Sequence, residues 1–420
     1  AMIRSLFVSM QALNKGARRP AAVAPRPLKK IGVLGAGFMG AGIAYVSALA
    51  GLGVVLIDRD PETVEKGKAH SQKLITDQIG RGNATAADRD ALLARIDATA
   101  DYVALKDCDL VIEAVFEDRK IKADVIAKIQ AAAGPGAIVA SNTSTLPITS
   151  LAAEFKDPAR FIGIHFFSPV DRMLLTEIIL GKQTGDAALA TALDYVRLIR
   201  KTPIVVNDSR GFYANRCVIN YLLEGHLMLI EGIPAAMIEN VARMAGMPVG
   251  PLSLNDEVAL DLTLRILRAT EADLGSKAVH PGEKKLIEAL VEKHGRFGRK
   301  NGKGFYDYPQ GQPKHLWPGL ADLQDKTLNE KQIDALDIGE LKHRLLVTQA
   351  LEAARTFEEK VITDVREADV GSVLGFGFAP FSGGTLSYID MMGTKNFVAL
   401  CRKLEKKFGQ RFAPNKLLLD

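Results

Sequence analysis

Three of the five glycines in the stretch KIGVLGAGFMGAGIA at residues 30–44 form the pattern Gly35-x-Gly37-x-x-Gly40. A β-rich run over residues 30–34 precedes the glycines, and an apolar helical run over 41–50 follows them. In that setting the first glycine permits a tight turn and the second lets a pyrophosphate approach the backbone. The third allows close helix–strand packing, with the anion at the helix N-terminus. The pattern therefore predicts a dinucleotide site.

Asp58 ends the next predicted strand, residues 54–58, and lies 23 residues after Gly35. A carboxylate there can accept both ribose hydroxyls and would repel a 2′-phosphate, so we expect NAD rather than NADP. The uncharged stretch 31–57 is long enough to cross a bilayer. Its seven glycines fit a turn–helix–turn better than one membrane helix, and we expect no transmembrane segment.

Strands and helices continue to alternate after this motif. A charged helical region is predicted over 61–98 and a helix over 119–133, with strands at 109–114, 137–140, 161–167, 174–180 and 203–207. Such alternation predicts a mostly parallel, doubly wound sheet. The fold class is therefore an α/β Rossmann-type dinucleotide-binding domain.

After Gly211 the alternation of strands and helices ends, and the sequence predicts helices separated by glycine and proline. GMPVGPL at 246–252 and GFGFAPF at 375–381 match at a shift of 129 residues (246 to 375), and the same shift pairs Val241 with Val370 and Asp261 with Asp390. Amphipathic helices are predicted before each copy, at 214–231 and 339–360. We expect an all-α region of two similar units, giving domains at 1–28 (linker), 29–211 (NAD-binding), 212–310 and 311–420 (first and second helical domains).

The first residues form a predicted amphipathic helix followed by a proline-rich run at 20–27. Its apolar positions are Ile3, Leu6, Phe7, Met10 and Leu13. Because the segment is basic and free of acids, it fits either a connecting helix from a longer chain or an organelle transit peptide. As a connecting helix, it should bury its apolar stripe against protein.

Composition narrows the class of protein further. The net charge of the 420 residues is +5, but seven basic residues and no acid lie within 1–57, so the rest of the chain is slightly acidic. This distribution argues against nucleic-acid binding, which needs a basic folded face. Three widely spaced cysteines exclude a disulfide framework and a cysteine zinc site. They suit a reducing compartment: the bacterial cytoplasm first, or the mitochondrial matrix or peroxisome of a eukaryote.

A candidate catalytic pair lies in the stretch IHFFSPVDRMLLTE at 164–177. If its two strands pair as a hairpin around 168–173, His165 lies opposite Glu177 and shares its face. The carboxylate then holds one ring nitrogen and leaves the other free to act as a general base on an alcohol. A structural histidine beside a glutamate is the alternative.

Two further polar groups are candidates by position. Ser-Asn-Thr-Ser at 141–144 follows a strand at the carboxyl edge of the sheet, where open α/β sheets bind ligands. It also fits an ordinary polar turn. Asn215 enters the helical region, where it either reaches back toward that edge or caps a helix.

Several long stretches together resemble one family. They are IGVLGAGFMGAGIA, LVIEAVFEDRKIK, ASNTSTLPI, IGIHFFSPVDRM, DSRGFYANRC, MPVGPLSLNDEVALD and GRKNGKGFYDY. In this order they resemble the L-3-hydroxyacyl-CoA dehydrogenase part of the multifunctional fatty-acid oxidation enzymes, over nearly the full length. The doubled helical unit is also similar to the multifunctional chains.

The resemblance implies roles for individual residues. His165 would be the general base and Glu177 its partner, and Ser144 and Asn215 would bind the substrate's 3-oxygen and support the histidine. Asp58 would take the adenosine ribose. Around the nicotinamide ribose would lie Glu117, Lys122 and Asn142. The implied reaction is NAD-dependent oxidation of a 3-hydroxyacyl-CoA to a 3-oxoacyl-CoA in fatty-acid β-oxidation.

The resemblance also implies partners: an acyl-CoA substrate, and a second copy of the chain or a thiolase subunit. It is weak over residues 62–82, where the family meets coenzyme A phosphates; candidates there are Lys66, Lys68, Lys73 and Arg81. No region of this chain fills the role of an enoyl-CoA hydratase. Two other functions stay open: a dehydrogenase of free 3-hydroxy acids, which usually relies on a lysine base, and a non-catalytic NAD-binding scaffold.

Overall fold

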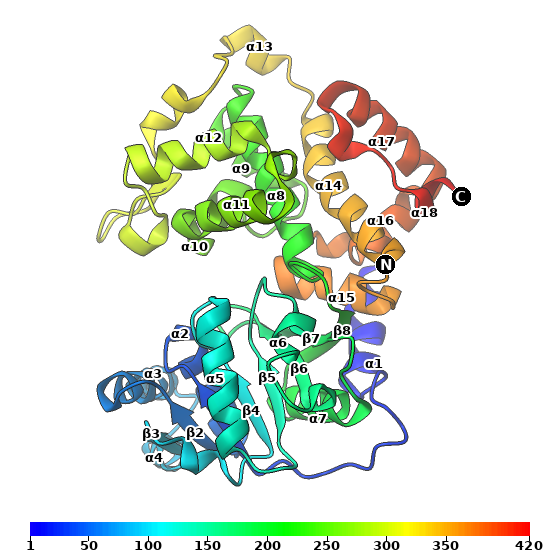
Figure 1. Cartoon of the computed structure of the whole chain (residues 1–420). Coiled ribbons are helices and arrows are strands. Elements are labelled where there is room, and N and C mark those ends of the chain that lie inside the picture. The colour runs from blue at the N-terminus through cyan, green and yellow to red at the C-terminus, as the bar shows by residue number, and fades with distance from the viewer. The chain divides into compact units, whose positions relative to one another are not determined.

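A computed structural model describes all residues from 1 to 420 and contains one large sheet (Figure 1). Its eight strands follow the order β3-β2-β1-β4-β5-β6-β7-β8, and every neighbouring pair is parallel except β6 with β7. The strands are β1 (Lys30–Leu34), β2 (Gly53–Ile57), β3 (Ile96–Thr99), β4 (Leu110–Glu113), β5 (Ile138–Ser141), β6 (Phe161–Phe166), β7 (Leu175–Leu180) and β8 (Thr202–Asn207). The predicted Rossmann-type fold is confirmed.

Helices connect these strands and bury the sheet. They are α2 (Phe38–Leu49), α3 (Pro61–Gly80), α4 (Ala86–Ala94), α5 (Arg119–Ala132), α6 (Ile148–Ala152) and α7 (Asp186–Leu198). Strands β1, β4 and β5 are buried at almost every position because they lie inside a parallel sheet with helices packed on it. The strand order reverses between β1 and β4, so the loops after these strands meet at the edge where such sheets bind ligands.

The prediction of a continuous helical region over 61–98 is wrong at its end. Thr85 and Asp88 form a capping box that starts α4, and the chain then enters the edge strand β3, paired with β2. Only Ile96 of β3 is fully buried. Ile96 and Ala98 of this strand alternate with Asp97 and Thr99, but a run of only four residues is the shortest that the alternation can identify.

The remainder of the chain is mostly helical and repeats four helices in order. The first set is α8 (Ala214–Ile230), α9 (Ala235–Met244), α10 (Pro251–Val258) and α11 (Leu260–Leu274). The second set is α14 (Ile338–Glu358), α15 (Val365–Phe376), α16 (Thr385–Met392) and α17 (Thr394–Phe408). Between them lie α12 (Pro281–Glu288), the two-stranded β9 (Tyr306–Asp307) and β10 (His315–Leu316), and α13 (Glu330–Asp334); α18 (Lys416–Leu419) ends the chain.

Backbone conformation supports the repeat. Ala259 separates α10 from α11 with φ 85° and ψ 124°, and Gly393 separates α16 from α17 with φ 83° and ψ 130°. The predicted pairing of Asp261 with Asp390 is wrong, because Asp261 lies in the first turn of α11 whereas Asp390 lies near the end of α16. The turn Pro380–Ser382 adds residues to the second copy and shifts the correspondence.

Contacts divide the chain into two compact units. One contains residues 3–215 with 359–375, and the other contains 1–2, 216–358 and 376–420. Much of α15 therefore packs with the sheet: Val205 N of β8 donates to Glu367 Oε1 at 2.9 Å. The domain limits at 28, 211 and 310 stay predictions.

The N-terminal segment is helical, as expected, over residues 4–9 (π-helical) and α1 (Met10–Asn14), but only part of the predicted apolar stripe is buried. Ser5, Ser9 and Leu13 are buried, whereas Ile3 and Phe7 are 75% and 61% exposed. The helix α1, which carries Leu13, contacts β8. The expectation of a buried apolar stripe is wrong at these two positions.

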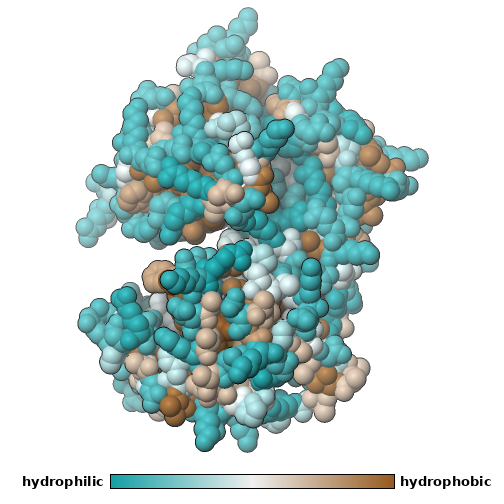
Figure 2. Space-filling view, viewed as in Figure 1, coloured by the Kyte–Doolittle hydropathy of each residue, from teal (hydrophilic) through white to brown (hydrophobic).

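Hydrophilic residues cover most of the surface seen in Figure 2. None of the helices combines the length and the apolar character that a membrane crossing requires. The uncharged stretch 31–57 folds into β1, α2 and β2, as the glycines indicated.

Candidate functional site

The glycine turn after β1 is built as the sequence predicts. Gly35 has φ 95°, and a Cβ on it would lie 2.6 Å from the carbonyl oxygen of Ala114 in the loop after β4. A Cβ on Gly40 would lie 1.7 Å from the carbonyl oxygen of Gly35, so this position packs helix α2 against the turn. At Gly37 the corresponding space holds no atom within 4 Å. The turn thus leaves open the approach that a dinucleotide phosphate needs at the N-terminus of α2.

Asp58 follows β2 and lies beside this turn. Its Oδ2 accepts a hydrogen bond from Ala36 N at 2.6 Å, and its Oδ1 accepts one from Arg59 N at 2.7 Å. The carboxylate is only partly buried. A negative charge fixed here suits the ribose hydroxyls of NAD.

His165 and Glu177 form the expected pair. Strands β6 and β7 are antiparallel, with His165 directly opposite Glu177. His165 Nδ1 lies 2.8 Å from Glu177 Oε2, and both side chains are buried. The predicted hairpin register is therefore confirmed.

Main-chain groups hold the other oxygen of Glu177. Its Oε1 accepts hydrogen bonds from Tyr213 N at 3.2 Å and from Ala214 N at 2.9 Å. Gly211 and Phe212 precede these amides with φ 73° and φ 52°, so two successive left-handed residues aim both N–H groups at one oxygen. A carboxylate whose oxygen accepts two such bonds is fixed in position.

Ser144 and Asn215 lie where the second nitrogen of His165 emerges. His165 Nε2 lies 3.2 Å from Ser144 Oγ, and Asn215 Nδ2 donates to the carbonyl oxygen of Ser144 at 3.0 Å. The structure therefore brings His165, Glu177, Ser144 and Asn215 together, although Asn215 contacts the main chain of Ser144 rather than the histidine.

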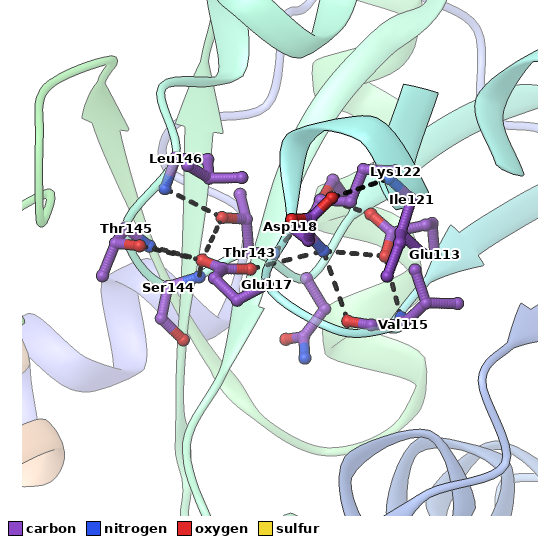
Figure 3. Close-up of polar contacts among 12 residues, drawn as sticks. Glu113, Val115, Glu117, Asp118, Ile121, Lys122, Thr143, Ser144, Thr145 and Leu146 are labelled. Carbon is purple, nitrogen blue, oxygen red and sulfur yellow. Dashed lines mark hydrogen bonds and ion pairs between the residues drawn. The ribbon is translucent and has the colours of Figure 1, made fainter. Parts of the chain in front are cut away.

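Asn142, Glu117 and Lys122 lie beside this group with their polar atoms engaged. Asn142 Oδ1 accepts from Phe166 N at 2.8 Å. Glu117 lies between Lys122 and the loop that carries Ser144 (Figure 3). Burial opposes ionisation of Glu117, but the Lys122 ammonium and the hydrogen bonds from the loop outweigh it and lower the pKa of this carboxyl.

Two buried charged groups, Lys201 and Glu113, escaped the sequence analysis. Lys201 is buried and donates to the carbonyl oxygens of Val170 and Met173 at 2.5 Å each, which holds the turn between β6 and β7. Burial lowers the pKa of Lys201 to about 8, against the opposing charge of Asp171. Glu113 ends β4 and pairs with Lys122 at 2.8 Å. The sequence offered one sign of Glu113, which is an acid near the end of a strand that was predicted to be buried, 109–114.

Two of the four predicted coenzyme A candidates, Lys66 and Lys68 on α3, have partners within the protein. Lys66 pairs with Glu62 one turn earlier at 2.7 Å, and Lys68 Nζ donates to the carbonyl oxygen of Ile96 at 2.8 Å. Neither contact points to a phosphate site.

Comparison with known proteins agrees with this geometry. Residues 30–209 match the family model for the 3-hydroxyacyl-CoA dehydrogenase NAD-binding domain, and residues 211–308 match the model for the C-terminal domain of the same enzymes. The (S)-3-hydroxybutyryl-CoA dehydrogenase of Ralstonia eutropha is 36% identical, with a TM-score of 0.63, over 68% of this chain and 100% of its own. The chain belongs to the 3-hydroxyacyl-CoA dehydrogenase family. It is an NAD-dependent oxidoreductase of that family, and the predicted family and cofactor are confirmed.

Two solved structures share the fold over almost the whole length. The 3-hydroxybutyryl-CoA dehydrogenase of Escherichia coli has a TM-score of 0.79 at 23% identity and covers 94% of this chain and 98% of its own. The dehydrogenase part of multifunctional enzyme 1 from C. elegans has a TM-score of 0.67 at 23% identity, with 98% and 96% covered. Both alignments extend beyond residue 308, where the family models end.

Proposed function

We propose that this enzyme oxidises the 3-hydroxyl of an L-3-hydroxyacyl-CoA to a 3-oxoacyl-CoA, with His165 as the general base and Glu177 as the group that orients it. Oxidation at C3 removes one proton from the hydroxyl and one hydrogen with two electrons from the carbon. NAD, when bound, supplies the acceptor for the latter. The proton is the part that the side chains of this protein must handle.

Each residue of the group has one task in this scheme. Glu177 keeps the proton of the neutral imidazole on Nδ1, so that Nε2 carries the free lone pair, and it stabilises the imidazolium once Nε2 has taken the substrate proton. Ser144 Oγ contacts the same nitrogen and can donate to the substrate's 3-oxygen. Asn215 holds the main chain of Ser144. Gly35, Gly37, Gly40 and Asp58 would hold the dinucleotide.

The observation that carries the proposal is the continuous chain from Glu177 through His165 to Ser144. Its two links measure 2.8 Å and 3.2 Å, and the remaining oxygen of Glu177 is satisfied by main-chain amides. A buried histidine with one nitrogen fixed by a carboxylate and the other facing a hydroxyl suits proton transfer to and from an alcohol. The family of the chain supports an acyl-CoA as the carrier of that alcohol.

The test is the reduction of acetoacetyl-CoA with NADH, followed by loss of NADH absorbance, beside free acetoacetate at equal concentration. We expect turnover with the thioester and little with the free acid. Preference for the free acid would favour the alternative 3-hydroxy-acid dehydrogenase. Binding of NADH without turnover of either compound would favour the scaffold function.

A further inference from the structure

Ser144 is held through its main chain as well as its hydroxyl, and one carboxylate oxygen binds the loop around it. Glu117 Oε1 accepts hydrogen bonds from Ser144 N at 2.9 Å and from Thr145 N at 2.9 Å. The same oxygen accepts from Thr143 Oγ1 at 2.6 Å and from Thr145 Oγ1 at 3.0 Å. Four donors from three consecutive residues thus converge on one atom (Figure 3).

The other side of Glu117 is held from helix α5. Its Oε2 lies 3.3 Å from Lys122 Nζ, and Lys122 Nζ lies 2.8 Å from Glu113 Oε1. Glu113 Oε2 accepts from Ser141 Oγ at 2.6 Å, at the end of β5. Lys122 is 1% exposed and Glu113 is fully buried, so this ion pair has little freedom to rearrange. Side-chain contacts therefore link the end of β4 to the end of β5 twice. One link is Glu113 with Ser141, and the other runs through Lys122 and Glu117 to the Ser144 loop.

We propose that Glu117 is a positioning residue: it fixes the loop 143–145 so that Ser144 Oγ stays within reach of His165 Nε2, and Lys122 with Glu113 hold Glu117 in place. This inference rests on the proposed function, because it assigns the reason for holding Ser144. It adds to the family resemblance, which implies a contact between Glu117 and the nicotinamide ribose, because the same carboxylate also holds the loop that carries Ser144.

The conservative variant Glu117→Gln tests the proposal. Glutamine keeps the length of the side chain, but its amide group turns a donor toward either Lys122 or the loop and loses the charge that strengthens the bonds. We expect kcat to fall about tenfold or more, with the dissociation constant for NADH within a factor of two of wild type. Asp118→Asn is the matched control, because Asp118 is the adjacent acid and caps α5 through Lys120 N and Ile121 N. The control should leave kcat unchanged.

A double-mutant cycle with Ser144→Ala separates positioning from general damage. If Glu117 acts through Ser144, Glu117→Gln should lower kcat little further once the serine hydroxyl is gone. Full additivity of the two losses would overturn the proposal. So would the opposite kinetic pattern, in which NADH affinity falls tenfold and kcat stays near wild type, because that pattern marks a cofactor ligand.

A second readout does not depend on turnover. Amide hydrogen exchange at Ser144 and Thr145 should accelerate at least tenfold in Glu117→Gln and stay at wild-type rates in Asp118→Asn. Unchanged exchange would overturn the proposal whatever the kinetics show. If the wild-type enzyme failed to reduce acetoacetyl-CoA while exchange still responded, the proposed substrate would be wrong and the support of the Ser144 loop by Glu117 would stand.

Discussion

Two buried histidines of this protein are each held by a glutamate through Nδ1, yet their surroundings differ. His165 Nδ1 lies 2.8 Å from Glu177 Oε2, and His226 Nδ1 of α8 lies 2.9 Å from Glu283 Oε1 of α12. The two rings are 4% and 0% exposed. By the pair alone, the two sites are equivalent.

The second ring nitrogen distinguishes them. His165 Nε2 lies 3.2 Å from Ser144 Oγ, in a loop rich in polar groups. His226 Nε2 is buried without a hydrogen-bond partner, and its ring stacks on Phe305 with centroids 5.4 Å apart and an angle of 18°. On the proposed function, the group that faces Nε2 distinguishes a histidine–glutamate pair that acts as a base from a pair that belongs to the core.

The largest expected effect comes from removing each histidine in turn. His165→Gln should lower kcat by roughly 10²–10⁴-fold, because a positioned general base contributes that much. NADH affinity should stay near wild type, since His165 does not hold the dinucleotide. His226→Gln should leave kcat per folded molecule unchanged and lower the free energy of unfolding by about 1–3 kcal/mol. Steady-state kinetics measures kcat of both variants, and urea unfolding measures their stability. Near-normal turnover of His165→Gln would contradict the proposed difference between the two histidines.

Substitution of the two glutamates tests the same difference between the His165 and His226 sites. In Glu177→Gln the amide can donate to Nδ1 and move the ring proton to Nε2, which removes the basic lone pair from the substrate side. We expect kcat to fall about 10²-fold, toward the lower end for general-base assistance. Glu283→Gln should change only stability, and equal kinetic losses in the two variants would show that access to Nε2 is irrelevant.

Besides Glu177 and Glu283, the buried carboxylate of Glu367 has an arginine partner instead of a histidine. We expect its ionisation to change the stability of the fold. Glu367 of α15 accepts from Val205 N and lies 3.0 Å from Arg18 Nη1. Burial raises the pKa of Glu367 to about 7, although Arg18 and the amide oppose it. The folded state then binds this proton more tightly than the unfolded chain, so stability falls as pH rises from about 5 to 7.

For Glu367 that loss should be on the order of 2 kcal/mol over this range. Urea unfolding at pH 5, 6 and 7 should show it as a shrinking difference between wild type and Glu367→Gln. A difference that is constant or grows with pH would contradict the assignment.

The smallest expected effect on kcat comes from removing the hydroxyl of Tyr213, the residue whose main-chain amide binds Glu177. Tyr213 N holds the carboxylate, and Tyr213 Oη donates to the carbonyl oxygen of Ala368 in α15 at 2.9 Å. Tyr213→Phe removes a bond worth about 1 kcal/mol, so kcat should fall at most about fivefold. Tyr221→Phe is the matched control, because Tyr221 Oη donates to the carbonyl oxygen of Val249 at 2.7 Å and should affect stability alone. Equal kinetic effects in both would contradict a specific support of Glu177.

Local pattern and spacing were enough to predict much of this protein. The glycine turn, Asp58 at the end of β2 and the opposition of His165 to Glu177 follow from contacts between adjacent elements, where counting residues fixes the geometry. The repeated helices were visible because their glycine and proline breaks recur. The family could be recognised from the sequence because its motifs are long and occur in a fixed order.

Only the tertiary structure decided which polar groups meet across separate strands. The contacts of Ser144 with His165 and Glu117 depend on the order of β4, β5 and β6, which no local spacing encodes. The N-terminal helix also shows this limit, because hydrophobic periodicity assumes that every large apolar side chain of one stripe turns inward. Leu13 of the predicted stripe is buried, but Ser5 and Ser9 are buried as well, and Ile3 and Phe7 are exposed.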